Sequence, residues 1–207
     1  MDPLHAILDV ETAARAGWEP ARLALAFFEA GARFLQVRAK RLPAAEFLSL
    51  CDEVVATAAP FGATVIVNDR VDLARMCSAA GVHVGQEDVP PAAARVQLGP
   101  SAIVGVSTHT LEQVVAAARE PVSYVAVGPV FGTSTKHTGY APVGLALVSA
   151  ARAQLPATIP LVAIGGITLE QAPRVIEAGA AQVAVIGDLL ATGNPGERIA
   201  AYYRALM

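Results

Sequence analysis

The chain has 207 residues, of which 54% are hydrophobic and 16% charged, a composition that favours a compact core and excludes disorder. Its formal net charge of −3 excludes an overall basic surface for nucleic acid, so an anionic ligand would have to meet a local cluster of cations. The two cysteines, Cys51 and Cys77, lack metal-ligand spacing and are expected to be reduced core residues. Neither a signal-peptide pattern nor a membrane-spanning run of about 20 apolar residues is present, which predicts a cytoplasmic protein.

Eight short runs rich in apolar and β-branched residues recur along the chain and predict strands. They cover residues 4–8, 34–37, 64–67, 81–84, 102–106, 124–127, 161–164 and 182–186. Segments with helical spacing lie over residues 19–30, 43–59, 110–119, 168–178 and 195–206. Strands that alternate with helices predict parallel βαβ units, and eight such units predict an α/β protein, a single-domain (β/α)8 TIM barrel over residues 1–207. The alternative, an open doubly wound sheet, lacks the glycine-rich fingerprint after its first strand.

In such a barrel, chemistry collects at the carboxyl ends of the strands. Polar residues lie at the carboxyl ends of the predicted strands or directly after them at Gln36, Arg38, Lys40, Asn68, Asp69, Asp88 and Ser107, and glycines follow the last two strands at Gly165, Gly166 and Gly187. Each group has a structural alternative: the cations as a surface ion-pairing edge, the aspartates as helix caps and the glycines as turns. Because all of them fall on one predicted rim, we favour a shared ligand site.

The loop after the sixth predicted strand carries Thr133, Thr135 and Lys136. Hydroxyls, backbone N–H groups and a lysine suit phosphate oxygens, although a solvated turn is the alternative. Together, the three cations and two carboxylates of the rim predict a diphosphate held by side-chain charge and by Mg²⁺, with Asp69 and Asp88 as metal ligands. The glycine turns predict a separate monophosphate site built from backbone N–H groups.

Six motifs, taken in order, resemble those of the thiamine-phosphate synthase (pyrophosphorylase) family over nearly the whole chain. They are QVRAK from Gln36, VNDRVD from Val67, GVHVGQED from Gly81, GVS from Gly105, GPVFGTSTK from Gly128 and AIGGI from Ala163. The resemblance implies a transferase that joins hydroxymethylpyrimidine diphosphate to thiazole phosphate, or its carboxylated form. Pyrophosphate leaves from a pyrimidine-cation-like state, and the product is thiamine phosphate.

The resemblance also implies a role for each matching position. Gln36 would bind the aminopyrimidine; the diphosphate would be held by Arg38, Lys40, Asn68 and Lys136; and Ser107 would lie at the reacting centre. Thr133 and Thr135 would line the thiazole side, the thiazole phosphate would be held by Gly165, Gly166, Ile186 and Gly187, and Mg²⁺ would bind Asp69 and Asp88. Arg38, Lys40, Ser107 and Lys136 are the implied catalytic residues. The implied partners are small-molecule substrates, without nucleic acid or membrane, and a homo-oligomer is left open.

Two positions depart from the family pattern, because Gly187 replaces a serine after the last strand and His5 replaces a tyrosine in the first. One alternative is a thiazole tautomerase-like isomerase, which uses a histidine where Pro129 stands. Others are a phosphosugar epimerase or decarboxylase, and a non-catalytic regulatory protein that binds thiamine precursors. His83, inside a predicted strand, is expected to be a packed core residue, and His109 a neighbour of a phosphate.

Overall fold

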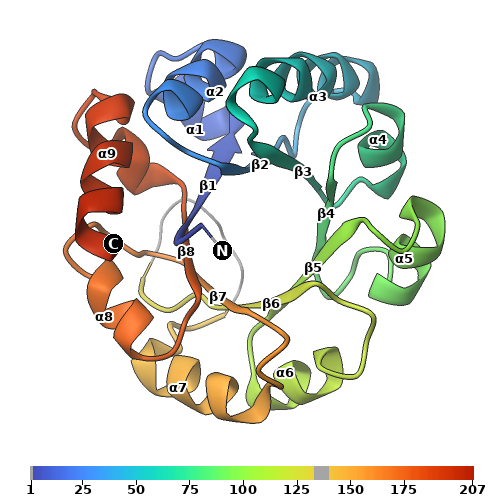
Figure 1. The fold of residues 1–207 in the computed structure, drawn as a ribbon, viewed down its shortest axis with the longest axis vertical. Helices are drawn as coiled ribbons and strands as arrows, with labels where there is room; N and C mark the ends of the chain where they lie inside the picture. Colours follow the sequence, from blue (N-terminus) through green and yellow to red (C-terminus); the bar gives the residue numbers. More distant parts are fainter. Residues whose placement is uncertain (1, 133–139) are drawn as a thin grey trace.

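The computed structural model describes residues 2–132 and 140–207. Eight parallel strands close into a barrel in sequence order, with β8 paired back to β1 (Figure 1). The strands are β1 Leu4–Asp9, β2 Phe34–Arg38, β3 Thr64–Asn68, β4 Gly81–Val84, β5 Ile103–Thr108, β6 Tyr124–Val127, β7 Leu161–Ile164 and β8 Gln182–Val185. The predicted TIM barrel is confirmed.

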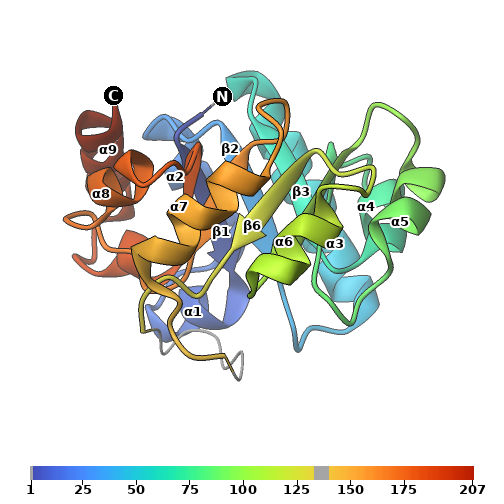
Figure 2. The same cartoon turned by 90° about the horizontal axis from the view of Figure 1, so that it is seen from below.

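Helices surround the barrel on its outer face, and both termini lie at the same end of it (Figure 2). They are α1 Val10–Arg15, α2 Pro20–Glu29, α3 Ala44–Ala58, α4 Val71–Met76, α5 Pro91–Leu98, α6 Leu111–Ala117, α7 Gly144–Gln154, α8 Ala172–Glu177 and α9 Pro195–Leu206, with 3-10 turns η1 Ala59–Phe61 and η2 Gly187–Leu190. The sequence patterns had not singled out α1, α4 or α7. Helix α8 begins four residues later than expected, because residues 168–171 form a turn in which the Gln171 side chain accepts from the Thr168 backbone N–H.

Side-chain hydrogen bonds fix where several helices begin. Asp9 caps α1 by accepting from the backbone N–H of Thr12 at 2.9 Å. Thr110 caps α6 by accepting from the backbone N–H of Gln113 at 3.3 Å, which is one half of a capping box. The Gln113 side chain accepts in turn from the backbone N–H of His109 at 2.6 Å. Two helix starts at the carboxyl ends of strands are therefore fixed by groups close to the rim.

Strand residues alternate between two hydrophobic environments, as the period of two in a β-strand requires. One set packs outward against the helices and includes Leu8, Leu35 and Val67. The other set fills the barrel interior, and its fully buried members are Ile7, Ile66, Tyr124, Ala126, Val162 and Ala184. Two residues beyond the inward positions Ile7, Gln36, Ile66 and Gly105 are Asp9, Arg38, Asn68 and Ser107, at the carboxyl ends of their strands. The strand period thus places the predicted polar residues at one mouth of the barrel.

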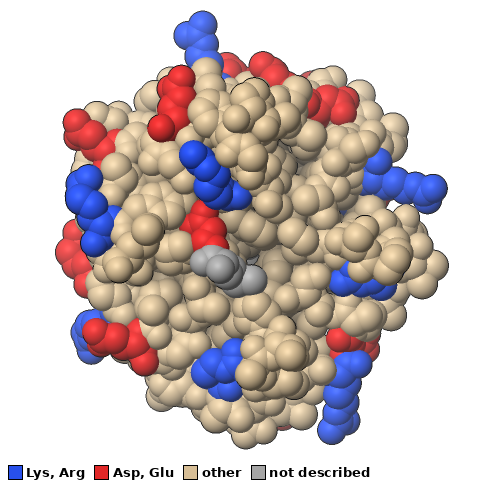
Figure 3. All heavy atoms as spheres, in the orientation of Figure 1, with Lys and Arg blue, Asp and Glu red and all other residues tan. Residues whose placement is uncertain are grey.

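The face with the amino-terminal strand ends carries interspersed acidic and basic side chains (Figure 3). Arg95 binds the loops before β5 and β6 together. Its guanidinium donates to the carbonyl oxygens of Pro100 at 3.1 Å and Pro121 at 3.2 Å, and also to that of Ala102 and to the Ser123 hydroxyl. The forked guanidinium lets one side chain satisfy carbonyls of two separate loops.

Cys51 and Cys77 are buried free thiols on α3 and directly after α4, as expected. Among residues 2–132 and 140–207, no helix combines the length and the apolar character that crossing a membrane requires.

Arg95→Lys is expected to lower the free energy of unfolding by about 1–3 kcal/mol, because a single ammonium group cannot reach carbonyls on both loops. Urea unfolding followed by circular dichroism measures the loss. The exposed Arg119→Lys is the matched control, and its stability should stay within about 0.5 kcal/mol of wild type. Equal effects from the two substitutions would show that the loop contacts of Arg95 contribute nothing.

Candidate active site

Two adjoining cavities open at the carboxyl ends of the strands. The charged cavity, of about 320 Å³, is lined by Arg38, Lys40, Asn68, Asp69, His83 and Asp88, among others. The glycine cavity, of about 450 Å³, is lined by Pro129, Ile164, Gly165, Gly166, Ile186 and Gly187, among others. Ser107 and His109 line both cavities. The structure therefore brings ten of the predicted site residues to the walls of two adjoining cavities.

The remaining predicted residues lie elsewhere. Gln36 lines neither cavity; its side chain is inside the barrel, with Nε2 3.2 Å from Nε2 of His5. The Gln36 amide oxygen is buried and has no hydrogen-bond partner among the described residues. Thr133, Thr135 and Lys136 lie outside the described residues.

Carboxylates already pair with both cations that line the charged cavity in the described part of the chain. Arg38 forms an ion pair with the buried Asp9, and Lys40 forms one with Asp69. Asp9 divides its two oxygens, because Oδ1 caps α1 while Oδ2 binds Arg38. With Glu87 and Asp88 also present, carboxylates outnumber cations in the described part of this site. An added anion would be repelled there unless another cation accompanied it.

Asp69 and Asp88 are held close together by the backbone around them. Asp69 adopts a left-handed φ of 61°, and its N–H donates to the His83 carbonyl at 2.7 Å. Asp88 Oδ2 accepts from the Gly85 N–H at 2.7 Å. Burial raises the pKa of Asp69; the hydrogen bond from Lys40 opposes this rise, and the neighbouring Asp88 adds to it.

A carboxyl pair of this kind suits a cation. In the described residues no three His, Cys, Asp or Glu side chains are grouped as a metal cluster, so these two carboxylates could supply only part of a coordination shell. Hard divalent cations that keep several waters and bind phosphate oxygens need no more than one or two carboxylates from the protein.

His83 is buried, as expected, and it also contacts a predicted site residue. Its Nε2 lies 2.8 Å from the Ser107 hydroxyl, and its ring lines the charged cavity. His109 Nδ1 lies 2.6 Å from the Gly128 carbonyl, and its ring stacks on Tyr140 with a centroid separation of 3.8 Å. The inward period of β4 was the signal that could have revealed His83, because inward positions near the carboxyl end of a strand lie beneath the site.

Two glycines in the wall of the glycine cavity hold positions that other residues rarely adopt. Gly165 and Gly166 have φ values of 102° and 64°, in the left-handed region. A Cβ at Gly166 would lie 2.3 Å from the carbonyl oxygen of Gly132. The neighbouring turn at Gly187 is held by Asp188, which pairs with Arg198 at 2.8 Å.

The family model and the relatives found by comparison with known proteins carry names for the same enzyme. The family model described as thiamine monophosphate synthase matches residues 7–189. A thiamine-phosphate synthase of Koribacter versatilis is 41% identical over 208 residues, covering 98% of this chain and 95% of its own. The thiamine-phosphate synthase of Chlorobium luteolum is 41% identical over 167 residues, which cover 81% of this chain and 78% of its own. The solved thiamine phosphate pyrophosphorylase of Pyrococcus furiosus superposes with a TM-score of 0.86 at 25% identity, covering 99% of this chain and 95% of its own.

Asp69→Asn is expected to gain stability relative to wild type as pH rises from about 4 to about 7. The pKa of Asp69 is raised in the folded state, so ionisation of Asp69 destabilises the wild-type fold over this range, and asparagine avoids that cost. Urea unfolding of the ligand-free proteins at several pH values measures the trend.

Asp72→Asn is the matched control with the opposite sign. The hydrogen bond from Arg70 lowers the pKa of Asp72, so wild type gains stability relative to the variant only as pH rises toward about 4, and the difference between the two stays constant from about 4 to about 7. This pair is exposed, so the effect should stay below about 1 kcal/mol. Parallel trends for the two variants would contradict the assignment of Asp69.

Proposed function

The chain belongs to the thiamine monophosphate synthase family, and we propose that its two joined cavities are the two halves of that family's active site. The enzyme is then a transferase that makes thiamine phosphate from hydroxymethylpyrimidine diphosphate and thiazole phosphate. One observation supports assigning one substrate to each cavity. The charged cavity and the glycine cavity share Ser107 and His109 as a common wall. On this assignment, two differently built anion sites meet at Ser107 and His109.

The diphosphate belongs in the charged cavity, beside Arg38, Lys40 and Asn68, with Lys136 assigned from the sequence alone. Among the described residues of that cavity carboxylates outnumber cations, which supports a bound divalent cation beside the diphosphate. Asp69 and Asp88 are the residues that would hold Mg²⁺. When bound, Mg²⁺ supplies positive charge that stabilises the departing diphosphate.

The aminopyrimidine ring would extend inward from the charged cavity toward Gln36. The buried amide oxygen of Gln36 has no partner in the described structure, so an incoming amino group would satisfy it. His5, which replaces the usual tyrosine, contacts the amide nitrogen of Gln36 and helps to fix the orientation of the side chain.

The thiazole phosphate belongs in the glycine cavity. Left-handed glycines bring backbone N–H groups close to a ligand without side chains in the way, which suits a phosphate. Gly187 lacks the hydroxyl of the usual serine, but its backbone N–H remains in a turn held by Asp188. Thr133 and Thr135 are assigned to the thiazole side from the sequence alone.

The chemistry needs positioning and electrostatic stabilisation more than proton transfer. The bond between the pyrimidine methylene and the diphosphate oxygen breaks, and the electron-rich aminopyrimidine stabilises the resulting cation. The thiazole nitrogen attacks that carbon without a proton to lose, so no general base is required. Ser107 lies in the shared wall, where the leaving group and the nucleophile would meet. Pro129 occupies the position at which the isomerase alternative would need a histidine.

Pyrophosphate release is expected only when both substrates and Mg²⁺ are present, to stop on addition of EDTA and to return with excess Mg²⁺. Asp88→Asn and Lys136→Ala should each lower kcat/KM by about 10²–10³, because each removes a charge that binds the leaving group or its metal. The exposed Arg41→Ala is the control and should stay within about twofold of wild type.

Two outcomes would contradict this proposal. Equal pyrophosphate release without thiazole phosphate would indicate a hydrolase. Binding of both substrates without turnover would favour the non-catalytic regulatory protein.

Gly166→Ala should raise the KM for thiazole phosphate at least about tenfold and leave the KM for the pyrimidine diphosphate within about twofold. The added Cβ forces the Gly132 carbonyl to move at the wall of the glycine cavity. Gly62→Ala imposes a similar left-handed strain, with φ 60° and no atom within 4 Å, so it controls for lost stability. A change in both KM values would contradict the division between the cavities.

A further inference from the structure

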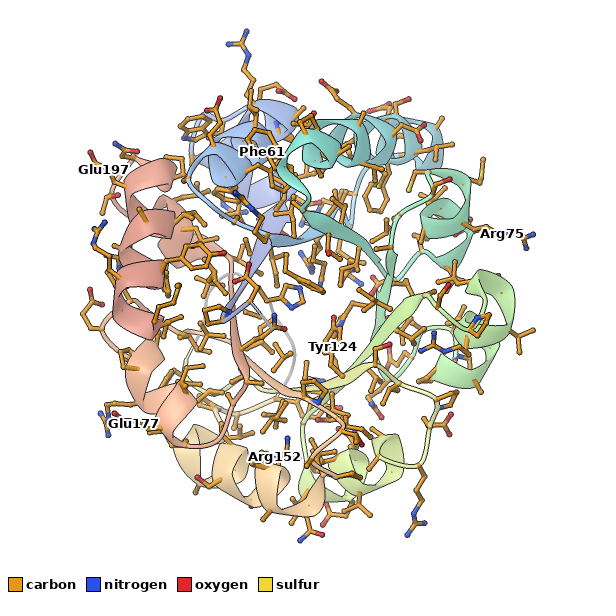
Figure 4. All side chains as sticks on the ribbon, viewed as in Figure 1. Phe61, Arg75, Tyr124, Arg152, Glu177 and Glu197 are labelled. Carbon is orange, nitrogen blue, oxygen red and sulfur yellow. The ribbon has the colours of Figure 1, made fainter. Side chains whose placement is uncertain are left out.

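Tyr124 reaches across a neighbouring strand inside the barrel. In the strand register, His83 of β4 is paired with Gly105 of β5, and Gly105 with Tyr124 of β6. A Cβ at Gly105 would lie only 2.0 Å from Cζ of the Tyr124 ring. The absent side chain at Gly105 therefore provides the space through which the tyrosine reaches His83, and Figure 4 shows Tyr124 in the barrel interior.

A continuous series of hydrogen bonds links this tyrosine to the cavity wall. The Tyr124 hydroxyl lies 2.7 Å from Nδ1 of His83, and Nε2 of His83 lies 2.8 Å from the Ser107 hydroxyl. The Tyr124 and His83 rings are also nearly parallel, with an interplanar angle of 17° and centroids 5.6 Å apart. Both ring nitrogens of His83 are thus held, one from the barrel interior and one from the site.

The direction of these bonds follows from burial. Tyr124 is only 2% exposed, and burial raises its pKa, so the phenol keeps its proton. His83 Nδ1 is the hydrogen-bond acceptor that the described structure offers to that proton, and leaving a buried O–H unpaired is strongly unfavourable. The phenol therefore donates to Nδ1, and in the neutral ring the proton is on Nε2. Nε2–H then donates to Ser107, whose own hydroxyl proton points away from His83.

We propose that Tyr124 is a positioning residue for the transfer: through His83, it sets the direction in which Ser107 donates a hydrogen bond into the cavities. This inference rests on the proposed function, in which Ser107 acts at the reacting centre. Without the phenol, His83 can take either tautomer. In the wrong tautomer it accepts the proton of Ser107, and the substrate loses that donor.

The first test is Tyr124→Phe, which keeps the ring and removes only the hydroxyl. We expect kcat to fall about tenfold while both KM values stay within about twofold, because the lost interaction acts on the reacting state. In a Ser107→Ala background the same substitution should cause no further loss, since Tyr124 acts through that hydroxyl. Tyr203→Phe removes a hydroxyl that contacts Asp2 at the other end of the barrel and should leave kcat unchanged.

The second test reads the tautomer directly, by NMR of the protein with ¹⁵N-labelled histidine. Wild type should show His83 protonated at Nε2, and Tyr124→Phe should show a mixture of tautomers. An unchanged tautomer, or an equal loss of kcat with and without the Ser107 hydroxyl, would overturn the proposal. An inactive wild type would instead refute the proposed function and, with it, this role. An active wild type with a fully active Tyr124→Phe variant would refute the role of Tyr124 alone.

Discussion

The closed barrel allows each strand to send only every second residue inward, and this constraint governs the rest of the structure. An eight-stranded barrel has an interior just wide enough for side chains, so the lower layers are filled by residues such as Ile7 and Ile66. The same inward rows end in Asp9, Arg38 and Asn68, where the interior opens. The buried hydrophobic layer and the charged layer at the mouth are thus formed by successive inward-facing positions of the same strands. The charged residues need no additional element to hold them there.

The last inward layer brings several charged side chains close together, so each buried charge needs an oppositely charged partner. Carboxylates supply these partners for the two cations of the charged cavity in the described part of the chain. Asp9 serves α1 with one oxygen and Arg38 with the other, so the start of a helix and the orientation of a cation are coupled. Lys40 also forms an ion pair with a carboxylate, that of Asp69. Under the proposed function, a metal ion at Asp69 would replace Lys40 as the partner of that carboxylate. Lys40 would then be available to the diphosphate, so metal and substrate would favour each other.

Local patterns predicted the barrel and most of the rim, because strand periodicity and the spacing of Arg38 and Lys40 are properties of adjacent residues. The partnership of Asp9 with Arg38 and the position of His83 between Tyr124 and Ser107 were not predictable, because they depend on the register between strands. That register is set by barrel closure, which no local pattern encodes. Helices α1 and α4 were not singled out, and with six residues each they offer fewer than two full turns in which a helical period could show.

Glycines in this chain act as much by making room as by bending the backbone. Gly105 lets a tyrosine cross its strand, and Gly166 lets a carbonyl oxygen approach the cavity wall. The same reasoning bears on Gly187, where the family's usual hydroxyl is missing. The adjacent Asp188 accepts hydrogen bonds from Tyr202, Arg198 and the backbone of Leu169, so the turn is fixed from outside the barrel. Under the proposed function, a backbone N–H in a turn fixed in this way would bind the thiazole phosphate without help from a side chain.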